Sequence, residues 1–244
     1  MAGAGRLIKI IPSLFDTFYY RKIKSLFGSS IIGYWPLWEL AGAVAADISG
    51  SGRNGAYTGV DLGYPGIGDG RKSPYFDGTH DYVNVYSAGL AGAFNGDEGT
   101  ILVWGKVYDA GVWTDGSYRN LCMFYVDASN YVTIRKNNTN TLGWRYDAGG
   151  SLKTLTLTVT PLTQMCIGLT WSKSNDRMRG FFSGRQIGTD QASLGAWAGA
   201  LSATTTGIGG YYFPVQYPWY GYLAHGVLLN REATPAEMTK AAQL

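Results

Sequence analysis

Residues 152–160 contain the clearest two-residue repeat in the chain, because Leu155, Leu157 and Val159 alternate there with threonines. Successive side chains of a β-strand point to opposite faces of a sheet, so the repeat predicts a strand with an apolar inner face and a threonine outer face. A strand that buries one face needs a second apolar layer beside it. The segment therefore favours a layered β-fold.

Further short apolar segments, closed by turn residues, continue along the chain. The other main strands that we predict span residues 100–107, 120–126, 131–136, 142–146, 165–171, 178–182 and 220–229. The 35 glycines suit tight turns, and the 8 tryptophans and 18 tyrosines suit half-buried pleated surfaces. We therefore predict an all-β fold in which residues 34–244 form one antiparallel β-sandwich of the jelly-roll type.

A helix is predicted over residues 13–27, between the N-cap Ser13 and the C-terminal Gly28. Its apolar residues recur at helical spacing and form one stripe, made of Leu14, Phe15, Phe18, Tyr19, Ile23, Leu26 and Phe27. Such a stripe is expected to be covered, by the sandwich, by a neighbouring subunit or by a membrane surface. Our leading prediction is that residues 1–33 form an arm that docks onto a neighbouring subunit.

The last residues of the chain predict a short C-terminal helix. Thr234 is suited to the N-cap, Pro235 to the first helical position, and Glu237 closes a capping box.

Charge and cysteine usage limit the possible partners. Residues 1–33 hold five basic residues and one acidic residue, a net charge of +4. The whole chain has a net charge of +3, so residues 34–244 have a net charge of −1. The sandwich therefore has no basic excess, and nucleic-acid binding is not expected. Apolar segments long enough to span a membrane are absent from the sequence. Cys122 and Cys166 lie in apolar segments, which predicts buried free thiols, with one cross-strand disulfide as the alternative.

Four groups of segments resemble a known family in the order in which they occur. They are residues 35–39 with 47–50 and 54–55; 76–78 with 81–83; 168–171 with 181–188; and 207–210 with 221–224 and 229–237. Together they are similar to laminin G-like domains of the concanavalin A-like lectin/glucanase group. The resemblance covers about residues 33–244 and implies a jelly-roll sandwich. In the third group, Ser183 and Gly184 stand where the family usually has Asp-Gly.

Two further parts of the chain, the N-terminal arm leading into Tyr34 and the segment 66–70, resemble laminin G-like proteins of tailed bacteriophages. This resemblance implies a non-enzymatic virion protein, such as a capsid decoration, tail or fibre component, that is assembled in many copies. Its implied partners are other virion proteins, which it contacts through the arm, and its implied location is the virion. A carbohydrate-binding, lectin-like adhesin, secreted or on a cell surface, is the alternative, because the fold alone does not fix a role.

The acidic residues and histidines give little support to catalysis. A glycosidase needs two carboxyl groups flanking the scissile bond. The glutamates are Glu39, Glu98, Glu232 and Glu237. Asp97 and Glu98 are the only adjacent acidic pair that includes a glutamate, and they lie in a predicted turn. His225 is in phase with Leu223, Val227 and Leu229 on one apolar face of its strand and is predicted to be a core histidine. His80 lies in a predicted exposed turn. We expect no enzymatic activity and keep a glycosidase as the third hypothesis.

A calcium site is the only metal site that the resemblance suggests. Asp47 and Asn54 match the glycine-rich turn through which some relatives hold calcium. His225, however, stands on the last strand where an acidic residue is common, and calcium prefers oxygen ligands. We expect no cofactor and interpret Asp47 as a turn former, with calcium as the alternative.

Two aromatic segments are candidates for a ligand or partner surface. The first is the turn at 113–118, and the second is the proline-interrupted segment at 211–220, which cannot be a central strand. The candidate residues are Trp113, Tyr118, Tyr211, Tyr212, Tyr217 and Trp219. Aromatic side chains at such places either stack on sugars or partners or pack over the end of the sandwich.

Overall fold

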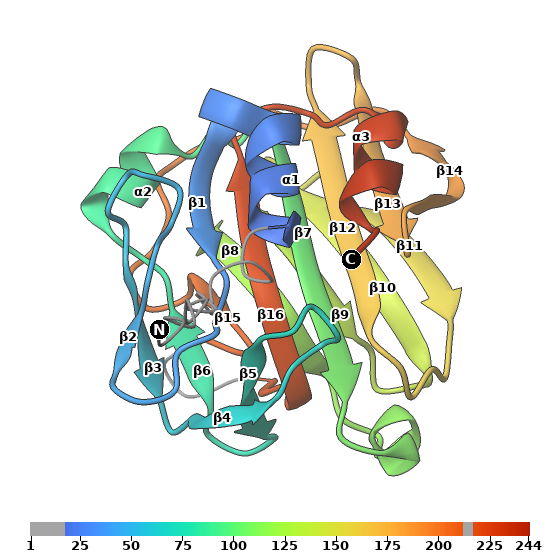
Figure 1. The fold of residues 1–244 in the computed structure, drawn as a ribbon. Helices are drawn as coiled ribbons and strands as arrows, with labels where there is room; N and C mark the ends of the chain where they lie inside the picture. The colour runs from blue at the N-terminus through green and yellow to red at the C-terminus, as the bar shows by residue number, and fades with distance from the viewer. Residues whose placement is uncertain (1–17, 212–216) are drawn as a thin grey trace, which may run out of the picture.

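The computed structural model describes residues 18–211 and 217–244, which form two antiparallel β-sheets packed face to face (Figure 1). Sheet A contains, in spatial order, β14 (Arg185–Gln191), β13 (Arg177–Phe182), β12 (Met165–Ser172), β7 (Glu98–Val107), β16 (Tyr220–Leu229), β5 (Lys72–Asp77) and β4 (Asp61–Pro65), and β1 (Ile31–Trp35) also pairs with β16. Sheet B contains β11 (Lys153–Thr158), β10 (Thr141–Asp147), β9 (Asn130–Lys136), β8 (Arg119–Asp127), β15 (Gly207–Ile208), β6 (Tyr82–Asn84), β3 (Gly55–Thr58) and β2 (Val44–Ala45). The predicted all-β sandwich is confirmed.

The main core lies between the two sheets and is rich in tryptophan. Trp35, Trp144 and Trp171 are fully buried there, together with aliphatic residues of both sheets. The two-residue repeat also behaves as predicted, because Leu155 faces this core while Thr156 is exposed. Burying these large side chains contributes about 1.5–3 kcal/mol for each residue, which makes the space between the sheets the main source of stability.

The N-terminal helix α1 (Phe18–Phe27) packs on the outer surface of sheet A. Its residues Tyr19, Ile23 and Phe27 are buried in a second apolar cluster, which includes Trp104 and Leu229. These residues were predicted to dock onto a neighbouring subunit, and that prediction is wrong for them. An apolar outer patch on sheet A lies within reach of the helix, so the stripe is covered within its own chain. Of the other predicted arm residues, Leu26 is half-buried against the same cluster, whereas Leu14, Phe15 and the side chain of Phe18 lie outside the described part of the chain.

No separate linker joins α1 to the sandwich. Gly28 adopts a left-handed conformation with φ 51°, as a residue that ends a helix often does, and the 3-10 turn η2 (Gly28–Ser30) leads directly into β1. Strand β1 spans the boundary predicted between residues 33 and 34 and pairs with β16, from Ile31 opposite Leu229 to Trp35 opposite Gly226. The end of the predicted arm is therefore part of sheet A.

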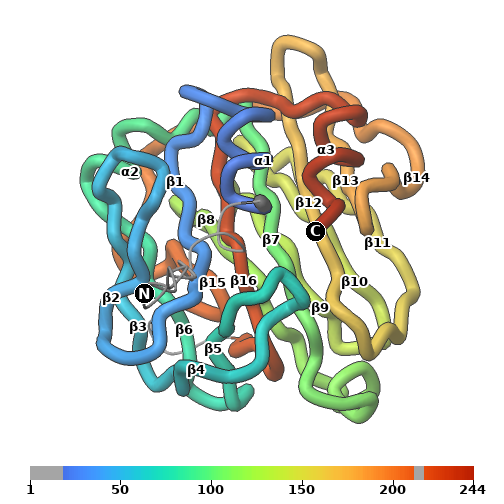
Figure 2. The backbone as a smooth tube through the Cα atoms, in the orientation of Figure 1, coloured from blue at the N-terminus to red at the C-terminus, as the bar shows by residue number. Residues whose placement is uncertain are grey.

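Helix α3 (Pro235–Ala241) lies beside α1 on the same surface of the sandwich (Figure 2). Thr234 and Glu237 form the predicted capping box with Pro235 in the first turn, so this helix is confirmed. The Tyr19 hydroxyl donates a hydrogen bond of 2.8 Å to the Ala241 carbonyl and thereby ties the two helices together. Both ends of the described chain thus cover sheet A.

A β-bulge in β16 changes which face each residue of this strand occupies. The pairing with β7 shifts between Ala224 and Val227, and His225 has a φ of 51° at the shift. Leu223 consequently faces the main core, whereas Val227 packs in the outer cluster under α1. The uniform alternation predicted for this strand is therefore wrong, because the bulge inserts one extra residue. His225 itself is buried, as predicted.

The predictions for the two cysteines and for His80 are also confirmed. Cys122 and Cys166 are both buried and both free, which confirms the thiol interpretation and excludes a disulfide between them. His80 is exposed, as predicted.

Two further helical turns, α2 (Ala88–Ala93) and η3 (Ala110–Thr114), connect strands. Within residues 18–211 and 217–244, no helix is long and apolar enough to cross a membrane.

Candidate functional site

An open groove of about 370 Å³ lies where the turn before β8 meets the segment before β16. Its lining residues are Gly78, Gly116, Ser117, Tyr118, Arg119, Tyr217 and Pro218. Small-molecule sites in proteins usually occupy about 300–1,000 Å³, so the groove has the size of a ligand site. It brings together two residues, Tyr118 and Tyr217, that the sequence placed in separate aromatic segments.

Arg119 fixes the floor of the groove. Its Nε pairs with Asp115 Oδ2 at 2.6 Å, and its Nη1 donates to the Pro218 carbonyl at 2.9 Å and to the Gly78 carbonyl at 3.2 Å. Asp115 also pairs with Lys136 Nζ at 2.5 Å. Burial acts to raise the pKa of Asp115, but the hydrogen bonds from Lys136, Ser117 and Arg119 outweigh it and hold the pKa below its ordinary value. The groove is therefore held open by ionised, fully bonded groups.

Tyr118 and Tyr217 line the groove, and Tyr211 and Arg135 lie against their rings. The rings of Tyr118 and Tyr217 are edge-on to one another, with centroids 5.5 Å apart, and Tyr211 is edge-on to Tyr217 at 6.3 Å. The guanidinium carbon of Arg135 lies 4.3 Å from the centroid of the Tyr118 ring and 5.9 Å from that of Tyr217. These four side chains are half-buried, so part of each faces solvent. Stacking on arginine limits the movement of the rings and presents them as a preformed surface.

The tryptophans predicted for the same surface do not belong to it. Trp219 is fully buried in the main core, and Trp113 is buried in η3, where its Nε1 donates to the Pro161 carbonyl at 3.0 Å. Their prediction as stacking residues is wrong, because both rings fill the interior at the end of the sandwich. Tyr212 lies outside the described residues.

Sequence analysis overlooked the arginines of this surface. Arg135 follows Val132 and Ile134 in β9, whose side chains are buried in the main core, and its own position alternates with theirs. A search for basic residues on the outward positions of a predicted strand would have found it. Its proximity to Tyr118, however, depends on how the turn before β8 folds back.

A second group of tyrosines lies at the lower end of sheet A. Tyr64, Tyr75 and Tyr222 come from three neighbouring strands, with centroids 5.2–6.0 Å apart. Tyr220 and Tyr108 extend the group, and their rings stack at 4.9 Å. These rings are not among the residues that line the groove of Tyr118 and Tyr217.

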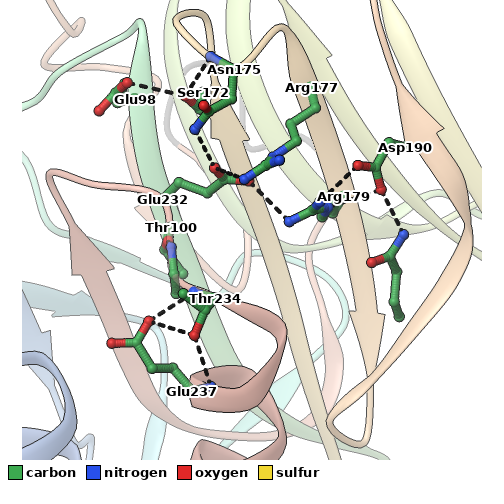
Figure 3. A network of polar contacts seen from close by, with 12 residues as sticks. Glu98, Thr100, Ser172, Asn175, Arg177, Arg179, Asp190, Glu232, Thr234 and Glu237 are labelled. Atoms are coloured by element: carbon green, nitrogen blue, oxygen red, sulfur yellow. Dashed lines mark hydrogen bonds and ion pairs between the residues drawn. The ribbon is translucent and has the colours of Figure 1, made fainter.

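Glu98 and Glu232, at one end of sheet A, are both engaged by hydrogen-bond partners (Figure 3). Glu232 accepts hydrogen bonds from Arg177 at 2.8 Å and 2.9 Å and from Arg179 at 3.4 Å. Glu98 accepts from the Ser172 hydroxyl at 3.0 Å and also from Ser174. Figure 3 shows this network at one end of β12 and β13, where it binds the strands to the chain that leads to α3. These contacts account for the carboxylates as structural groups.

Asp47 forms the turn that the sequence interpretation assigned to it. Its carboxylate accepts hydrogen bonds from the backbone N–H groups of Tyr34 at 3.0 Å, Ser49 at 2.8 Å and Arg53 at 2.8 Å. Asn54 Oδ1 accepts from the Asp47 N–H at 2.9 Å. These oxygens therefore serve as acceptors within the turn. Within the part of the chain that the structure covers, no three His, Cys, Asp or Glu residues come together as metal ligands.

Fold and groove together define an antiparallel β-sandwich with an open groove at one end. A scan against protein-family models finds no match, and a search of curated proteins finds none. Solved structures with the same fold are found, but their sequence identity to this chain is low. The similarity is therefore evidence for the fold only. The botulinum neurotoxin serotype D binding domain is 13% identical with a TM-score of 0.64, and the match covers 87% of this chain and 51% of that one.

Two similar structures contain bound sugars. The serotype D ligand binding domain in complex with N-acetylneuraminic acid is 12% identical, with a TM-score of 0.66 over 88% of this chain and 51% of that one. Domain 4 of AbnA, an extracellular arabinanase from Geobacillus stearothermophilus, in complex with arabinotriose, is 11% identical, with a TM-score of 0.64 over 88% of this chain and 98% of that one. The chain thus spans about half the length of the neurotoxin domains and nearly all of the arabinanase domain.

Proposed function

We propose that this protein is a non-enzymatic carbohydrate-binding module and that its ligand lies in the groove between Tyr118 and Tyr217. The observation that carries the proposal is the preformed aromatic wall, in which Arg135 holds Tyr118 at 4.3 Å beside an open groove of about 370 Å³. Sugars have apolar C–H faces and polar edges, so they are suited to a surface that offers both rings and hydrogen-bonding groups.

Two further observations support a binding role without catalysis. Two of the similar structures are complexes with N-acetylneuraminic acid and with arabinotriose, as reported above. In addition, Asp115, the carboxylate that holds the groove together, is shared by Arg119 and Lys136 and has a pKa below its ordinary value. A general acid needs a pKa near the working pH, so Asp115 is not suited to that task.

The proposal is tested by a glycan array followed by titration calorimetry with the best oligosaccharide found. We expect Tyr118→Ala and Tyr217→Ala each to weaken binding about tenfold, because each removes one stacking ring. Tyr64→Ala is the matched control, since it removes a half-buried tyrosine from sheet A, outside the groove. An array without any hit would contradict the proposal, and a loss that follows Tyr64→Ala instead would move the site to sheet A.

We also propose that the module is displayed on a virion, on the basis of the sequence resemblance described above. The described part of α1 packs on its own sandwich, so attachment through Tyr19, Ile23 and Phe27 is not part of this proposal. Immunogold labelling of purified particles with an antibody against the sandwich tests it. Gold on the particles is the expected result, and recovery of the protein only in a particle-free fraction would contradict it.

A further inference from the structure

Arg145 has no partner for its charge within the described chain. It lies on β10 between the inward-facing Trp144 and Tyr146, so its side chain lies on the outer face of sheet B. Its guanidinium makes no hydrogen bond or ion pair with any described residue, and its Nε is buried. An arginine carries five N–H donors, and burying one of them without an acceptor costs about 1–3 kcal/mol. Such a group is rarely retained for stability.

Arg135 lies next to it on the neighbouring strand. The Cα partner of Arg135 in β10 is Gly143, two residues before Arg145. Its Nε donates to Asn137 Oδ1 at 3.2 Å, and no carboxylate among the described residues pairs with it. Burial and the like charge of Arg145 lower the pKa of Arg135. Two cations are therefore held close together, at a free-energy cost, beside the rings of Tyr118 and Tyr217.

The carboxylate on the same face does not neutralise this pair. Asp147 follows Arg145 by two residues on β10, but one of its oxygens has no partner at all. Burial and the nearby charge of Asp127 raise the pKa of Asp147, and no arginine counteracts this shift. Asp147 is thus not a counterion for Arg145, and the positive charge of the pair is available to a ligand.

We infer that Arg145 and Arg135 bind the acidic group of a glycan, a carboxylate or a sulfate, whose sugar ring lies against Tyr118 and Tyr217. This inference rests on the proposed function and specifies its ligand as an acidic oligosaccharide. The guanidinium plane matches the two oxygens of a carboxylate or sulfate, and charge-assisted hydrogen bonds of this kind are about twice as strong as neutral ones. The tyrosine rings favour a sugar over a bare inorganic anion, because an anion gains nothing from stacking.

The test uses a glycan array that contains neutral, carboxylated and sulfated oligosaccharides, together with an oligothymidylate as a nucleic-acid probe. Calorimetry then compares each acidic hit with its neutral counterpart, for example sialyllactose with lactose, lactose 3′-sulfate with lactose, and trigalacturonic acid with its methyl ester. We expect the acidic member to bind at least tenfold more tightly at low salt, with an advantage that shrinks as salt is raised. The carboxylated and sulfated arms show which acidic group the arginines prefer.

Variants assign the effect to the arginines. Arg145→Gln is the primary variant because it breaks no contact, and it is expected to remove most of the acidic preference while binding of the neutral sugar persists. Arg145→Lys keeps the charge without the planar fork and should retain part of the preference. Arg185→Gln, an exposed arginine at the edge of sheet A, is the matched control and should change nothing.

The outcomes separate this inference from the function on which it rests. Equal affinity for acidic and neutral sugars would overturn the inference and leave the carbohydrate-binding function in place. An array with no hit at all would overturn both. Binding of oligothymidylate as tight as that of the acidic sugars would also overturn the inference, because the arginines would then recognise phosphate without the sugar surface.

Discussion

Arginines lie on the outer face of sheet A and on the outer face of sheet B, but their charge pairing differs between the two faces. On β13, Arg177 pairs with Glu232, and Arg179 pairs with Asp190 and Glu232 (Figure 3). On β9 and β10, Arg135 and Arg145 have no carboxylate partner among the described residues. The charge of the first pair is balanced within the chain, whereas no carboxylate among the described residues balances the second pair.

The two faces also differ in what covers them. Helices α1 and α3 lie over sheet A and bury an apolar cluster around Ile23 and Trp104. None of the helices in the described part of the chain packs closely on β8, β9 or β10, and the outward tyrosines of sheet B are half-buried. Under the proposed function, sheet A serves stability and sheet B serves recognition.

Ile23→Ala should lower the free energy of unfolding by about 2–4 kcal/mol, because it opens a cavity beneath α1 where the side chain is fully buried. Urea denaturation followed by tryptophan fluorescence measures the change. The control is Leu40→Ala, which truncates a residue that is 70% exposed and should have an effect below about 0.5 kcal/mol. Equal effects of the two variants would mean that α1 does not stabilise sheet A.

Asp69→Asn should lower the free energy of unfolding at pH 7 by about 1–3 kcal/mol, because it replaces the buried carboxylate that lies 2.7 Å from His225 Nε2 with a neutral amide, a weaker acceptor. Tyr34 completes this group through its hydroxyl, 2.8 Å from His225 Nδ1. Burial acts to raise the pKa of Asp69, but the hydrogen bond and charge of His225 outweigh it and lower the pKa below its ordinary value.

The lowered pKa of Asp69 fixes the sign of the pH dependence. A carboxyl group that ionises more readily in the folded state stabilises the protein above the pKa of the unfolded chain, and this contribution is lost as the pH falls through the folded pKa. The carboxyl group titrates over the range from about pH 5 to about pH 2. Over this range the wild-type protein should therefore lose more stability than Asp69→Asn does. Parallel pH profiles of the two proteins would contradict the assignment.

Glu232→Gln should lower the free energy of unfolding by about 1–2 kcal/mol, because Arg177 and Arg179 lose a shared ionised partner at the surface. Thermal unfolding of the wild-type protein and of the variant, at low and at high salt, measures this change in stability. The wild-type advantage over the variant should narrow at high salt, since the side chain of Arg177 is 33% exposed. A salt-independent difference would point to lost packing instead of lost charge pairing.

Arg145→Met should leave stability unchanged or raise it by up to about 1 kcal/mol, because it removes an unpaired buried donor and the repulsion from Arg135. Arg179→Met, which removes a paired arginine from sheet A, should instead destabilise the protein. Thermal unfolding of both variants compares the two faces directly. A marked loss of stability in Arg145→Met would show that this arginine serves the fold of sheet B.

The sequence predicted much of the fold because its strands carry their own signals. The alternation around Leu155 and the capping box at Thr234 and Glu237 depend on neighbouring residues only, and both are confirmed. The bulge at His225 escaped prediction because the residue has a left-handed φ of 51° without being a glycine. That conformation persists because Asp69 and Tyr34 hold the ring from two other segments.

The candidate site was predicted only in part, and the reason lies in the aromatic residues. Sequence patterns located Tyr118 and Tyr217 but equally selected Trp113 and Trp219, which are buried. Large aromatic side chains suit both a core and a binding surface, so composition alone cannot separate the two roles. Arg135 was missed because its importance comes from ring contacts with residues distant in the sequence.

The sequence by itself determined the elements: where strands alternate, where turns close them, and that an apolar helical stripe needs a cover. Only the tertiary structure decided that sheet A provides this cover and that two arginines on sheet B have no carboxylate partner among the described residues. The physical reason is the range of the forces that are involved. Backbone preferences and side-chain alternation act over a few residues, whereas burial and charge pairing depend on which distant segments meet when the sheets stack.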